Sequence, residues 1–287
     1  MSSFLKEYHR QPKLYIDLPS QGYYYDETVV KDKAYSNIPV FGMNAMDEII
    51  FKTPDALLSG TATTEVIQSC IPHIEDPWKI VGFDIDYILI SLRIATYGDT
   101  MTIKTACPHC SEFHENEILL TKVLENFVNC PITNSFNVGD FKINLRPLSY
   151  KESTDFSMQN FVIERQIMAV NNTADISRED KEKQLQEIFI ESSNLNLLVA
   201  VSHIESIEKD SEVEADNLAI LEFIQNNDAE FYSSLRESIK TLTEQWNLPN
   251  INIQCANEEC SKEYKTKLTL DYSNFFGARS LNSRNLI

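Results

Sequence analysis

Four cysteines, arranged in two pairs, are the residues of this 287-residue chain whose types and spacing could do chemistry. Two residues separate Cys107 from Cys110, and four separate Cys255 from Cys260. The residues that follow match: Cys110-Ser-x-x-His-x-x-x-Ile corresponds to Cys260-Ser-x-x-Tyr-x-x-x-Leu, and apolar residues alternate before each pair. This pattern is typical of two zinc knuckles, hairpins that point thiolates at one metal ion. We therefore predict one Zn²⁺ bound by all four cysteines.

Other interpretations of the cysteines stay open from the sequence. The two pairs could be buried free thiols, or their similarity could be fortuitous. His109 or His114 could replace one thiolate, although a histidine in a knuckle is more often a surface residue. Cys70 and Cys130 have no cysteine close to them in the sequence, so we expect both to be small buried side chains.

The expected metal centre is structural. A catalytic zinc keeps one coordination position open for water, and four thiolates leave none, which argues against a metallohydrolase. The motifs Gly-x-x-x-x-Gly-Lys-Ser/Thr, Gly-x-Gly-x-x-Gly, Gly-x-Ser-x-Gly and His-Glu-x-x-His do not occur in the sequence. We therefore expect no enzymatic activity and no small-molecule substrate.

Strand patterns surround both cysteine pairs and must position them. Residues 100–147 have strand character: apolar residues alternate before the first cysteine pair and again around a hairpin turn at Gly139-Asp140. Strand character returns after Pro249. The chain between these stretches, residues 149–246, is acidic and helical in periodicity. Within it, residues 207–216 have many acidic and few apolar side chains, and we interpret them as a linker.

Helix signals are clearest in two places. In residues 44–97, Asn44 is expected to cap one helix. Asp84 and Asp86 lie at the start of another, where acidic side chains favour the helix dipole. In the second block, Ser177 is expected to cap a helix with an apolar buried face. That face would carry Leu185, Ile188, Phe189, Leu195, Leu198 and Val199.

The predicted fold class is α+β. It has a zinc-ribbon-like core of two cysteine knuckle hairpins, an N-terminal extended or β arm, and a large helical insertion. The expected parts are an arm over 1–43, a helical and zinc-knuckle core over 44–148 and 249–276, a helical insertion over 149–248, and a C-terminal tail over 277–287. The zinc would join the two ends of the insertion, where closing a long loop restricts the unfolded chain most.

The charge of the chain argues against nucleic-acid binding. It has 43 acidic and 25 basic residues, a net charge of −18, and no block rich in Lys or Arg. Affinity for a phosphate backbone depends on such basic residues.

The N-terminal sequence carries charges where a signal peptide is apolar. Ser91 and Arg93 interrupt the longest apolar run, so we expect no membrane-spanning segment. We expect the protein to assemble in a cytosol, where paired cysteines bind metal ions more often than they form disulfides.

Two polar residues lie in apolar helical stretches. Arg93 is expected to be buried or to lie in an interface with an ion-pair partner, because an unpaired guanidinium is costly there. The alternative is an arginine at the helix edge whose charged head reaches solvent. His203 is expected to be a core histidine with its hydrogen bonds satisfied rather than a catalytic group.

Aromatic and basic residues near both ends suggest surfaces for other proteins. Amphipathic aromatic side chains are common at interfaces, although ordinary packing explains the tyrosines equally well. In the tail, the phenylalanines are expected to pack on the knuckle hairpins and the arginines to reach a neighbouring subunit. The candidate partner-binding residues are Tyr23, Tyr24, Tyr25, Phe275, Phe276, Arg279 and Arg284.

Several segments, taken in their order, resemble a known family. They are Leu18-Pro-Ser-x-Gly-x-x-Tyr25, Lys52-Thr-Pro-Asp-Ala-Leu-Leu-x-x-Gly-Thr61, Ile67-x-Ser-Cys-Ile71, Leu92-Arg-Ile-Ala-Thr-Tyr-Gly98, Cys107-Pro-His-Cys110, Arg146-Pro147 and Asn274-Phe-Phe276. This order resembles the T4-like phage baseplate hub protein family, and the resemblance covers residues 14–147 and 251–276.

The resemblance implies a structural subunit or an assembly factor of a contractile phage tail, in the hub or wedge region of the baseplate. It implies a location in the virion tail after assembly in the host cytoplasm, other baseplate and tail proteins as partners, and no enzymatic activity. The alternative from the residues alone is a zinc-ribbon adaptor that binds nucleic acid or transcription machinery. Carboxylates around the cysteines argue against that alternative: Glu112, Glu115, Glu117, Glu258, Glu259 and Glu263.

Overall fold

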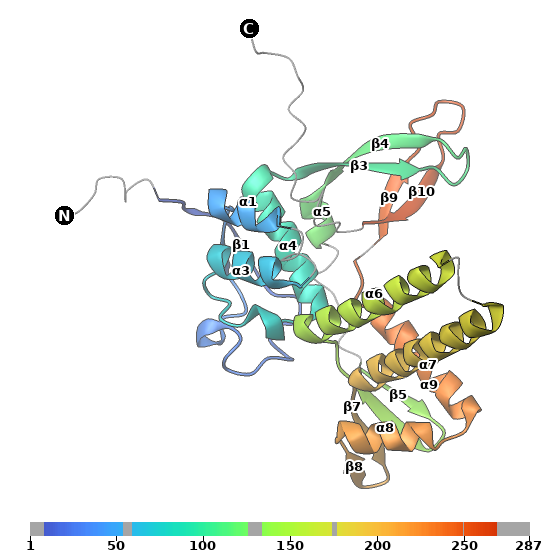
Figure 1. The fold of residues 1–287 in the computed structure, drawn as a ribbon. Helices are drawn as coiled ribbons and strands as arrows, with labels where there is room; N and C mark the ends of the chain where they lie inside the picture. Colours follow the sequence, from blue (N-terminus) through green and yellow to red (C-terminus); the bar gives the residue numbers. More distant parts are fainter. Residues whose placement is uncertain (1–8, 54–58, 126–133, 174–176, 249, 269–287) are drawn as a thin grey trace. The chain divides into compact units, whose positions relative to one another are not determined.

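The computed structural model describes residues 9–53, 59–125, 134–173, 177–248 and 250–268 (Figure 1). The chain separates into two compact units. Unit 1 consists of two segments, Met1–Cys130 and Asn247–Ile287, and unit 2 is the segment between them, Pro131–Trp246. Helices and small antiparallel sheets occur in both, so the prediction of an α+β protein is confirmed.

The N-terminal part of unit 1 is a two-stranded sheet with helices. Strand β1 (Pro12–Ile16) pairs antiparallel with β2 (Ile38–Phe41). Helices α1 (Ala45–Phe51), α3 (Thr61–Cys70) and α4 (Gly82–Tyr97) follow. Two short 3₁₀ helices, η2 (Lys31–Lys33) and η3 (Pro77–Lys79), lie in the connections.

Helix α4 is the centre of the apolar core of unit 1, and it contacts β1, β2, α3 and α5 (Leu120–Glu125). Apolar residues on one face of α4 are buried: Ile85, Ile88, Leu89 and Leu92. Residues on its other sides are buried too: Ile90, Ser91 and Arg93. A helix that is buried all round belongs to the middle of a domain rather than to its surface.

The ends of α1 and α4 follow local sequence signals. The Asn44 side chain accepts hydrogen bonds from the backbone amides of Met46 and Asp47, and the Asp47 carboxylate accepts one from the Asn44 amide. This capping box confirms the predicted cap. Helix α4 ends at Gly98, whose φ of 91° is a conformation that other residues rarely adopt.

Unit 1 also contains the two cysteine hairpins. Strand β3 (Thr100–Ala106) pairs antiparallel with β4 (Phe113–Leu119). Strand β9 (Asn250–Gln254) pairs in the same way with β10 (Glu263–Lys267). The first hairpin lies in the N-terminal segment of unit 1 and the second in its C-terminal segment.

In the described part of unit 2 the strands form one four-stranded antiparallel sheet in the order β5-β6-β7-β8. These strands are β5 (Ser135–Val138), β6 (Phe141–Leu145), β7 (Ile204–Lys209) and β8 (Glu212–Glu214). The hairpin predicted around Gly139 is therefore confirmed.

The interpretation of residues 207–216 as a linker is wrong, because most of them form the β7–β8 hairpin. Ile207 is buried and pairs with Ile143 of β6. The carboxylate of Glu208 lies 3.1 Å from Lys142 Nζ on the neighbouring strand. The acidic residues that suggested a solvated linker thus occupy the exposed positions of strands, where cross-strand cations partly balance them.

Four helices are described in unit 2: α6 (Tyr150–Asn172), α7 (Arg178–Ser202), α8 (Asn217–Gln225) and α9 (Ala229–Glu244). Helices α6 and α7 pack against each other as a hairpin, and α7 also contacts β7 and α8. Ser177 caps α7 through the amide of Asp180, as predicted. The buried residues between the two helices are Ile163, Val170, Ile188 and Leu195.

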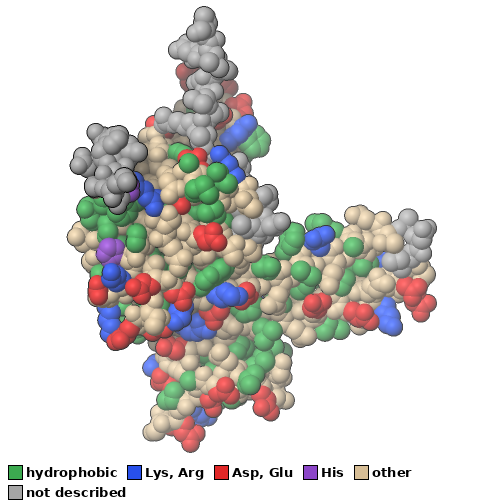
Figure 2. Space-filling view, turned by 60° about the vertical axis from the view of Figure 1, so that its left-hand side comes forward, with side chains coloured by type: hydrophobic (Ala, Val, Ile, Leu, Met, Phe, Trp, Pro, Cys, Tyr) green, Lys and Arg blue, Asp and Glu red, His purple; other side chains and the backbone are tan. Residues whose placement is uncertain are grey.

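Two residues expected on the buried face of α7 are exposed. Phe189 is 59% and Leu198 is 41% exposed, and Figure 2 shows hydrophobic side chains at the surface of the hairpin. Ile188 faces α6, and consecutive residues of a helix point about 100° apart, so Phe189 cannot face α6 as well. In the same way, Val199 packs against the buried cluster, so the neighbouring Leu198 points in a different direction.

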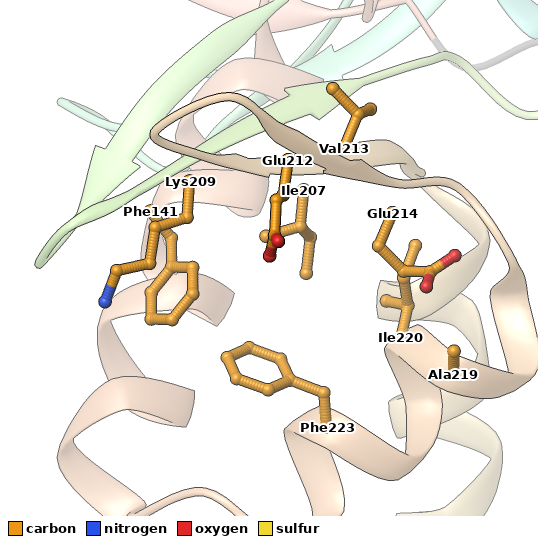
Figure 3. A pocket seen from close by; sticks show the side chains of 9 residues that line it. All are labelled: Phe141, Ile207, Lys209, Glu212, Val213, Glu214, Ala219, Ile220 and Phe223. Atoms are coloured by element: carbon orange, nitrogen blue, oxygen red, sulfur yellow. The ribbon is translucent and has the colours of Figure 1, made fainter.

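An aromatic cluster joins the sheet of unit 2 to α8 and α9. The ring centroid of Phe141 lies 5.1 Å from that of Phe223 and 6.0 Å from that of Phe231. Beside this cluster, the β7–β8 hairpin and α8 enclose an open pocket of about 660 Å³. Figure 3 shows the rings of Phe141 and Phe223 lining this pocket, with Lys209 beside Phe141 and the Glu212 carboxylate directed towards it.

His203 is partly buried in unit 2. Its Nδ1 atom is 3.1 Å from the carbonyl oxygen of Arg146, and its ring lies 6.2 Å from that of Trp246. Burial lowers its pKa below the ordinary value. The contact with a backbone carbonyl gives this partly buried histidine a hydrogen-bond partner, as expected for a structural rather than a catalytic residue.

Candidate metal centre

The two hairpins of unit 1 bring four sulfur atoms together. The Sγ atoms of Cys107, Cys110, Cys255 and Cys260 all lie within 4.8 Å of one another. Cys107 Sγ is 3.9 Å from Cys260 Sγ, and Cys110 Sγ is 3.7 Å from Cys255 Sγ. The cysteines that the sequence selected thus form one group, although 144 residues separate the two pairs.

The same turn builds both knuckles. In the first, the Ser111 amide donates to the Cys107 carbonyl at 2.8 Å, and the Cys107 amide donates to the Glu112 carbonyl at 2.9 Å. In the second, the Cys255 amide donates to the Lys262 carbonyl at 2.9 Å. Ser111 and Ser261, the residues after each second cysteine, both have a positive φ, of 62° and 45°. The match in sequence is therefore a match in backbone conformation.

The wider spacing of the second pair is taken up inside its turn. The amides of Cys260 and Ser261 both donate to the carbonyl of Asn257, at 3.1 and 2.8 Å. The Asn257 side chain accepts a hydrogen bond from the Glu259 amide at 2.8 Å. The two extra residues thus lengthen the turn without changing where it rejoins the hairpin.

Side chains hold the hairpins against each other around the sulfur atoms. The hydroxyl oxygens of Thr105 and Tyr264 are 2.7 Å apart, and Asn116 donates to Thr105 at 2.9 Å. At the turns, the side-chain Nδ2 of Asn257 donates to the Glu112 carboxylate at 2.7 Å. The buried residues of this cluster are Cys107, Ile253, Cys255 and Tyr264.

The protein environment treats the four thiols unequally. Burial opposes ionisation of Cys107, but the backbone amides of His109 and Cys110 outweigh it and lower the pKa of Cys107 to about 7. Burial and the neighbouring cysteines raise the pKa of Cys255 to about 12. Like charges this close disfavour each other, and a bound cation would offset this repulsion among four thiolates.

The spacing of the sulfur atoms fits a tetrahedral metal ion. A zinc–sulfur bond of about 2.3 Å places the sulfurs of a tetrahedron about 3.8 Å apart. The Cys110–Cys255 and Cys107–Cys260 separations of 3.7 and 3.9 Å agree with this value, and all four sulfur atoms lie within 4.8 Å of one another. Four thiolates are the donor set of structural zinc and of iron–sulfur sites. The group can therefore hold a metal ion with a complete shell of protein ligands.

His114 lies beside the sulfur atoms, contrary to the expectation of a surface residue. Its Nε2 atom is 3.4 Å from Cys255 Sγ and 4.0 Å from Glu112 Oε2, and the side chain is only 13% exposed. An imidazole here can donate a hydrogen bond to a metal-bound thiolate. His109 is exposed in the first turn, as expected.

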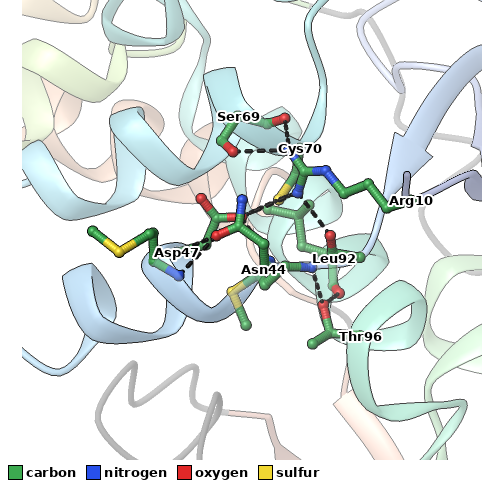
Figure 4. Close-up of polar contacts among 10 residues, drawn as sticks. Arg10, Asn44, Asp47, Ser69, Cys70, Leu92 and Thr96 are labelled. Atoms are coloured by element: carbon green, nitrogen blue, oxygen red, sulfur yellow. Dashed lines mark hydrogen bonds and ion pairs between the residues drawn. The ribbon is translucent and has the colours of Figure 1, made fainter. Parts of the chain in front are cut away.

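Cys70 is separate from this group and is buried, as expected. Figure 4 shows it within a polar cluster that Arg10 organises. Arg10 Nη1 lies 3.1 Å from Asp47 Oδ2 and 3.5 Å from Cys70 Sγ, and it donates to the carbonyl of Gly42 at 2.8 Å. Burial raises the pKa of Cys70 to about 12, so this thiol is neutral. Cys130 lies outside the described residues.

The candidate partner-binding tyrosines have different environments. Tyr23 is exposed, whereas Tyr24 and Tyr25 are partly buried. The Tyr25 hydroxyl donates to the buried carboxylate of Asp84 at 2.5 Å, and the Ser20 amide donates to the same carboxylate at 3.0 Å. The helix dipole therefore accounts only in part for an acidic residue at position 84. The Asp84 carboxylate also holds the segment between β1 and β2 through its hydrogen bonds with Ser20 and Tyr25. Phe275, Phe276, Arg279 and Arg284 lie outside the described residues.

Arg93 is buried on α4, so that part of the prediction is confirmed. Its guanidinium carbon lies 5.3 Å from the centroid of the Tyr97 ring, one turn further along the helix. This geometry allows a cation–π interaction.

Comparisons with known proteins agree with the family suggested by the sequence. A family model described as T4 bacteriophage base plate protein matches residues 42–277, a span that contains all four cysteines. Searches of curated proteins and of solved structures found no match. Among the described residues, no helix has the length and apolar character needed to cross a membrane. Because the family match covers most of the sequence, the chain belongs to the T4 bacteriophage base plate protein family.

Proposed function

We propose that this baseplate protein is a structural subunit, or an assembly factor, of the hub or wedge region of a contractile phage tail, and that one zinc ion closes its first unit. The observation that carries the proposal is the group of four sulfur atoms. Two come from the segment before unit 2 and two from the segment after it. A metal ion at this position links two distant parts of the chain.

The link explains how a large insertion is accommodated. In this proposal the core is formed by residues 44–148 and 249–276, with the arm 1–43 before it, the insertion 149–248 within it and the tail 277–287 after it. Zinc bound to Cys107, Cys110, Cys255 and Cys260 holds the ends of the insertion together. The ion supplies a rigid tetrahedral connection when it is bound, and folding and metal binding are coupled.

The proposed role is to bind other proteins of the baseplate in the virion tail, after assembly in the host cytoplasm. A complete ligand shell leaves no coordination position for a substrate, which supports a role without catalysis. The partner surfaces that we propose contain Tyr23, Tyr24, Tyr25, Phe275, Phe276, Arg279 and Arg284. Nucleic acid, membranes and small molecules are not partners in this proposal.

The zinc part is tested by metal analysis of the purified full-length protein. We expect about one zinc per chain, as one four-thiolate site requires. Cys107→Ser or Cys260→Ser should remove the metal and loosen the fold. Cys70→Ala is the matched control, because it removes a buried cysteine outside the group and should leave the zinc content unchanged. Absence of zinc, with all four thiols reactive in the native protein, would refute the metal site.

The baseplate part is tested by complementation of a phage that lacks this chain. The wild-type protein should restore assembled baseplates, and Cys260→Ser should not. Deletion of residues 279–287 separates the tail from the fold: the melting temperature should stay unchanged while incorporation into baseplates is lost. Normal infectious particles made without the chain would refute a role as subunit or assembly factor.

A further inference from the structure

Helix α6 is apolar on two sides, although among the described elements it packs mainly on α7. One side carries Ile163 and Val170, which are buried against α7. On the second side, Met158 is 46% and Val162 is 51% exposed. A helix that is apolar on more than one face is normally covered on each of them. The hairpin of α6 and α7 therefore lacks a covering element in the described structure.

A groove runs between the two helices next to this exposed side. Its volume is about 410 Å³. The residues that line it are Met158, Gln159, Val162, Ile163, Glu191, Asn194, Leu195 and Leu198. Ile163 and Leu195 form its floor, since both belong to the buried cluster between the helices. The exposed apolar side chains of Met158, Val162 and Leu198 form its edges.

The one charged residue among the described residues that line this groove is acidic, Glu191. Unit 2 as a whole contains 21 acidic and 10 basic residues, a net charge of −11. A second copy of this chain would place like charges against each other, which is unfavourable. Charge complementarity instead requires a partner with a positive surface around an apolar stripe.

We propose that the α6–α7 groove binds a basic amphipathic helix of another baseplate protein. This inference rests on the proposed function, which supplies the partner's origin. A third helix laid between two antiparallel helices completes a bundle with ordinary ridge-and-groove packing. Apolar side chains at positions i, i+3 or i+4 and i+7 of the partner fill the groove. Lysine or arginine beside them faces Glu191.

The length of the groove sets the size of the partner segment. Glu191 and Leu198 are seven residues apart on α7, which corresponds to about 10 Å of helix, or two turns. Two or three apolar anchors span this distance. The partner segment is therefore short, and its affinity is expected to fall as salt screens the flanking charges.

The test places a photo-activated crosslinking residue at Asn194 of the full-length protein in phage-infected cells. Asn194 is exposed and lines the groove, so the substitution should leave the fold intact. The crosslinked peptide is identified by mass spectrometry. We expect a segment of another baseplate protein with apolar residues at helical spacing and a net positive charge.

Two substitutions provide the matched comparison. Val162→Glu puts a carboxylate into the groove, and Met168→Glu makes a similar change at an exposed residue of α6 outside it. We expect Val162→Glu to reduce the Asn194 crosslink by at least about tenfold, because it buries an unpaired charge in the contact. Met168→Glu should change it by less than about twofold. If the crosslink came from non-specific attraction of a basic partner, both substitutions would increase it, because each adds a negative charge.

Several outcomes would overturn the proposal. They are a crosslink to a second copy of this chain, to its own residues, or to an acidic segment, and a yield no higher than that from the same crosslinker at Met168. Lysine crosslinking of the same samples separates this failure from a failure of the proposed function. If only the groove assignment is wrong, crosslinks from other parts of the chain to baseplate proteins persist. If the chain does not act in the baseplate, those crosslinks are absent too.

Discussion

The α4 region and the two cysteine hairpins belong to the same compact unit but are stabilised by different means. Around α4, large aliphatic side chains such as Ile88, Leu89 and Leu92 are completely buried. The hairpins share only a small cluster, in which two of the four buried residues are cysteines. Isolated two-stranded hairpins are marginally stable in water.

The difference shows where a metal is needed. Burial of apolar surface contributes about 25 cal/mol per Å², so a core of many aliphatic side chains suffices for the α4 region. The hairpins bury too little to offset the entropy of ordering their chains. Four thiolates around one ion can replace the missing core, because metal-binding free energy becomes folding free energy.

The largest effect should therefore come from metal removal, and it should be local. A strong chelator should raise amide hydrogen exchange in β3, β4, β9 and β10 by several orders of magnitude. Structural zinc contributes on the order of 10 kcal/mol of binding free energy at neutral pH. Exchange in α4 should change far less, because its core contains none of the ligands. Equal loss of protection in both regions would show that the α4 region depends on the metal as much as the hairpins do.

The converse experiment weakens the aliphatic core and leaves the metal site intact. Leu89→Ala removes a fully buried side chain from α4 and should destabilise the protein by about 2–5 kcal/mol. The zinc content should remain that of the wild type, because Leu89 does not belong to the sulfur cluster. Denaturant unfolding and metal analysis on the same sample measure both. A variant that loses its metal would show that the two regions depend on each other.

The sequence was sufficient to predict the cysteine hairpins, because the spacing within each pair and the alternation beside it are local signals. It was not sufficient for His114, which was expected at the surface. A signal was present: His114 occupies the position that corresponds to Tyr264 in the second hairpin, and Tyr264 is buried. Both side chains point towards the interface between the hairpins, since they share the same parity along matched strands.

The errors in unit 2 have a common physical origin. Apolar residues at neighbouring positions, such as Ile188 and Phe189, were assigned to one buried face, yet only tertiary contacts decide which of them faces the partner helix. The charge of residues 207–216 suggests a linker, but the pairing of this stretch with β6 depends on residues about 60 positions earlier in the chain. Signals that depend on distant chain segments are not visible in local patterns.

The polar cluster of Arg10 tests whether the α4 region depends on burial alone. Arg10 connects the chain before β1 to α1 and α3 through Asp47 and the backbone of Ser69. Asp47 is buried, and loss of its cation leaves a carboxylate with weaker compensation. Arg10→Ala should lower the free energy of unfolding by about 2 kcal/mol, less than for a fully buried pair because Arg10 is one-third exposed.

Arg10→Lys is the matched control for this cluster. It keeps the positive charge near Asp47 but cannot reproduce all of the guanidinium hydrogen bonds, so part of the stability should be retained. Denaturant titration of the wild type, Arg10→Lys and Arg10→Ala should show the free energy of unfolding decreasing in that order. If Arg10→Ala unfolds at the same denaturant concentration as the wild type, the cluster contributes nothing and burial alone accounts for this region.

The smallest expected effect concerns two acidic residues on α4 and depends on pH. Burial raises the pKa of Asp86 to about 7, well above the value of about 3.9 in an unfolded chain. The folded protein therefore binds this proton more tightly, and the free energy of unfolding increases as pH falls through 7. Between pH 8 and 6 this amounts to about 1 kcal/mol, and the same contribution is lost as pH rises.

Asp86→Asn should remove that pH dependence and stabilise the protein at pH 8, because the amide carries no charge to desolvate. Asp84→Asn is the informative counterpart. Burial also raises the pKa of Asp84, to about 6, but its carboxylate accepts hydrogen bonds from Ser20 and Tyr25. Asparagine loses one acceptor oxygen there, so this variant should be less stable at every pH. Measurements with zinc in excess keep the metal site constant. If both variants respond alike, burial alone governs the two carboxylates and the hydrogen bonds of Asp84 add nothing.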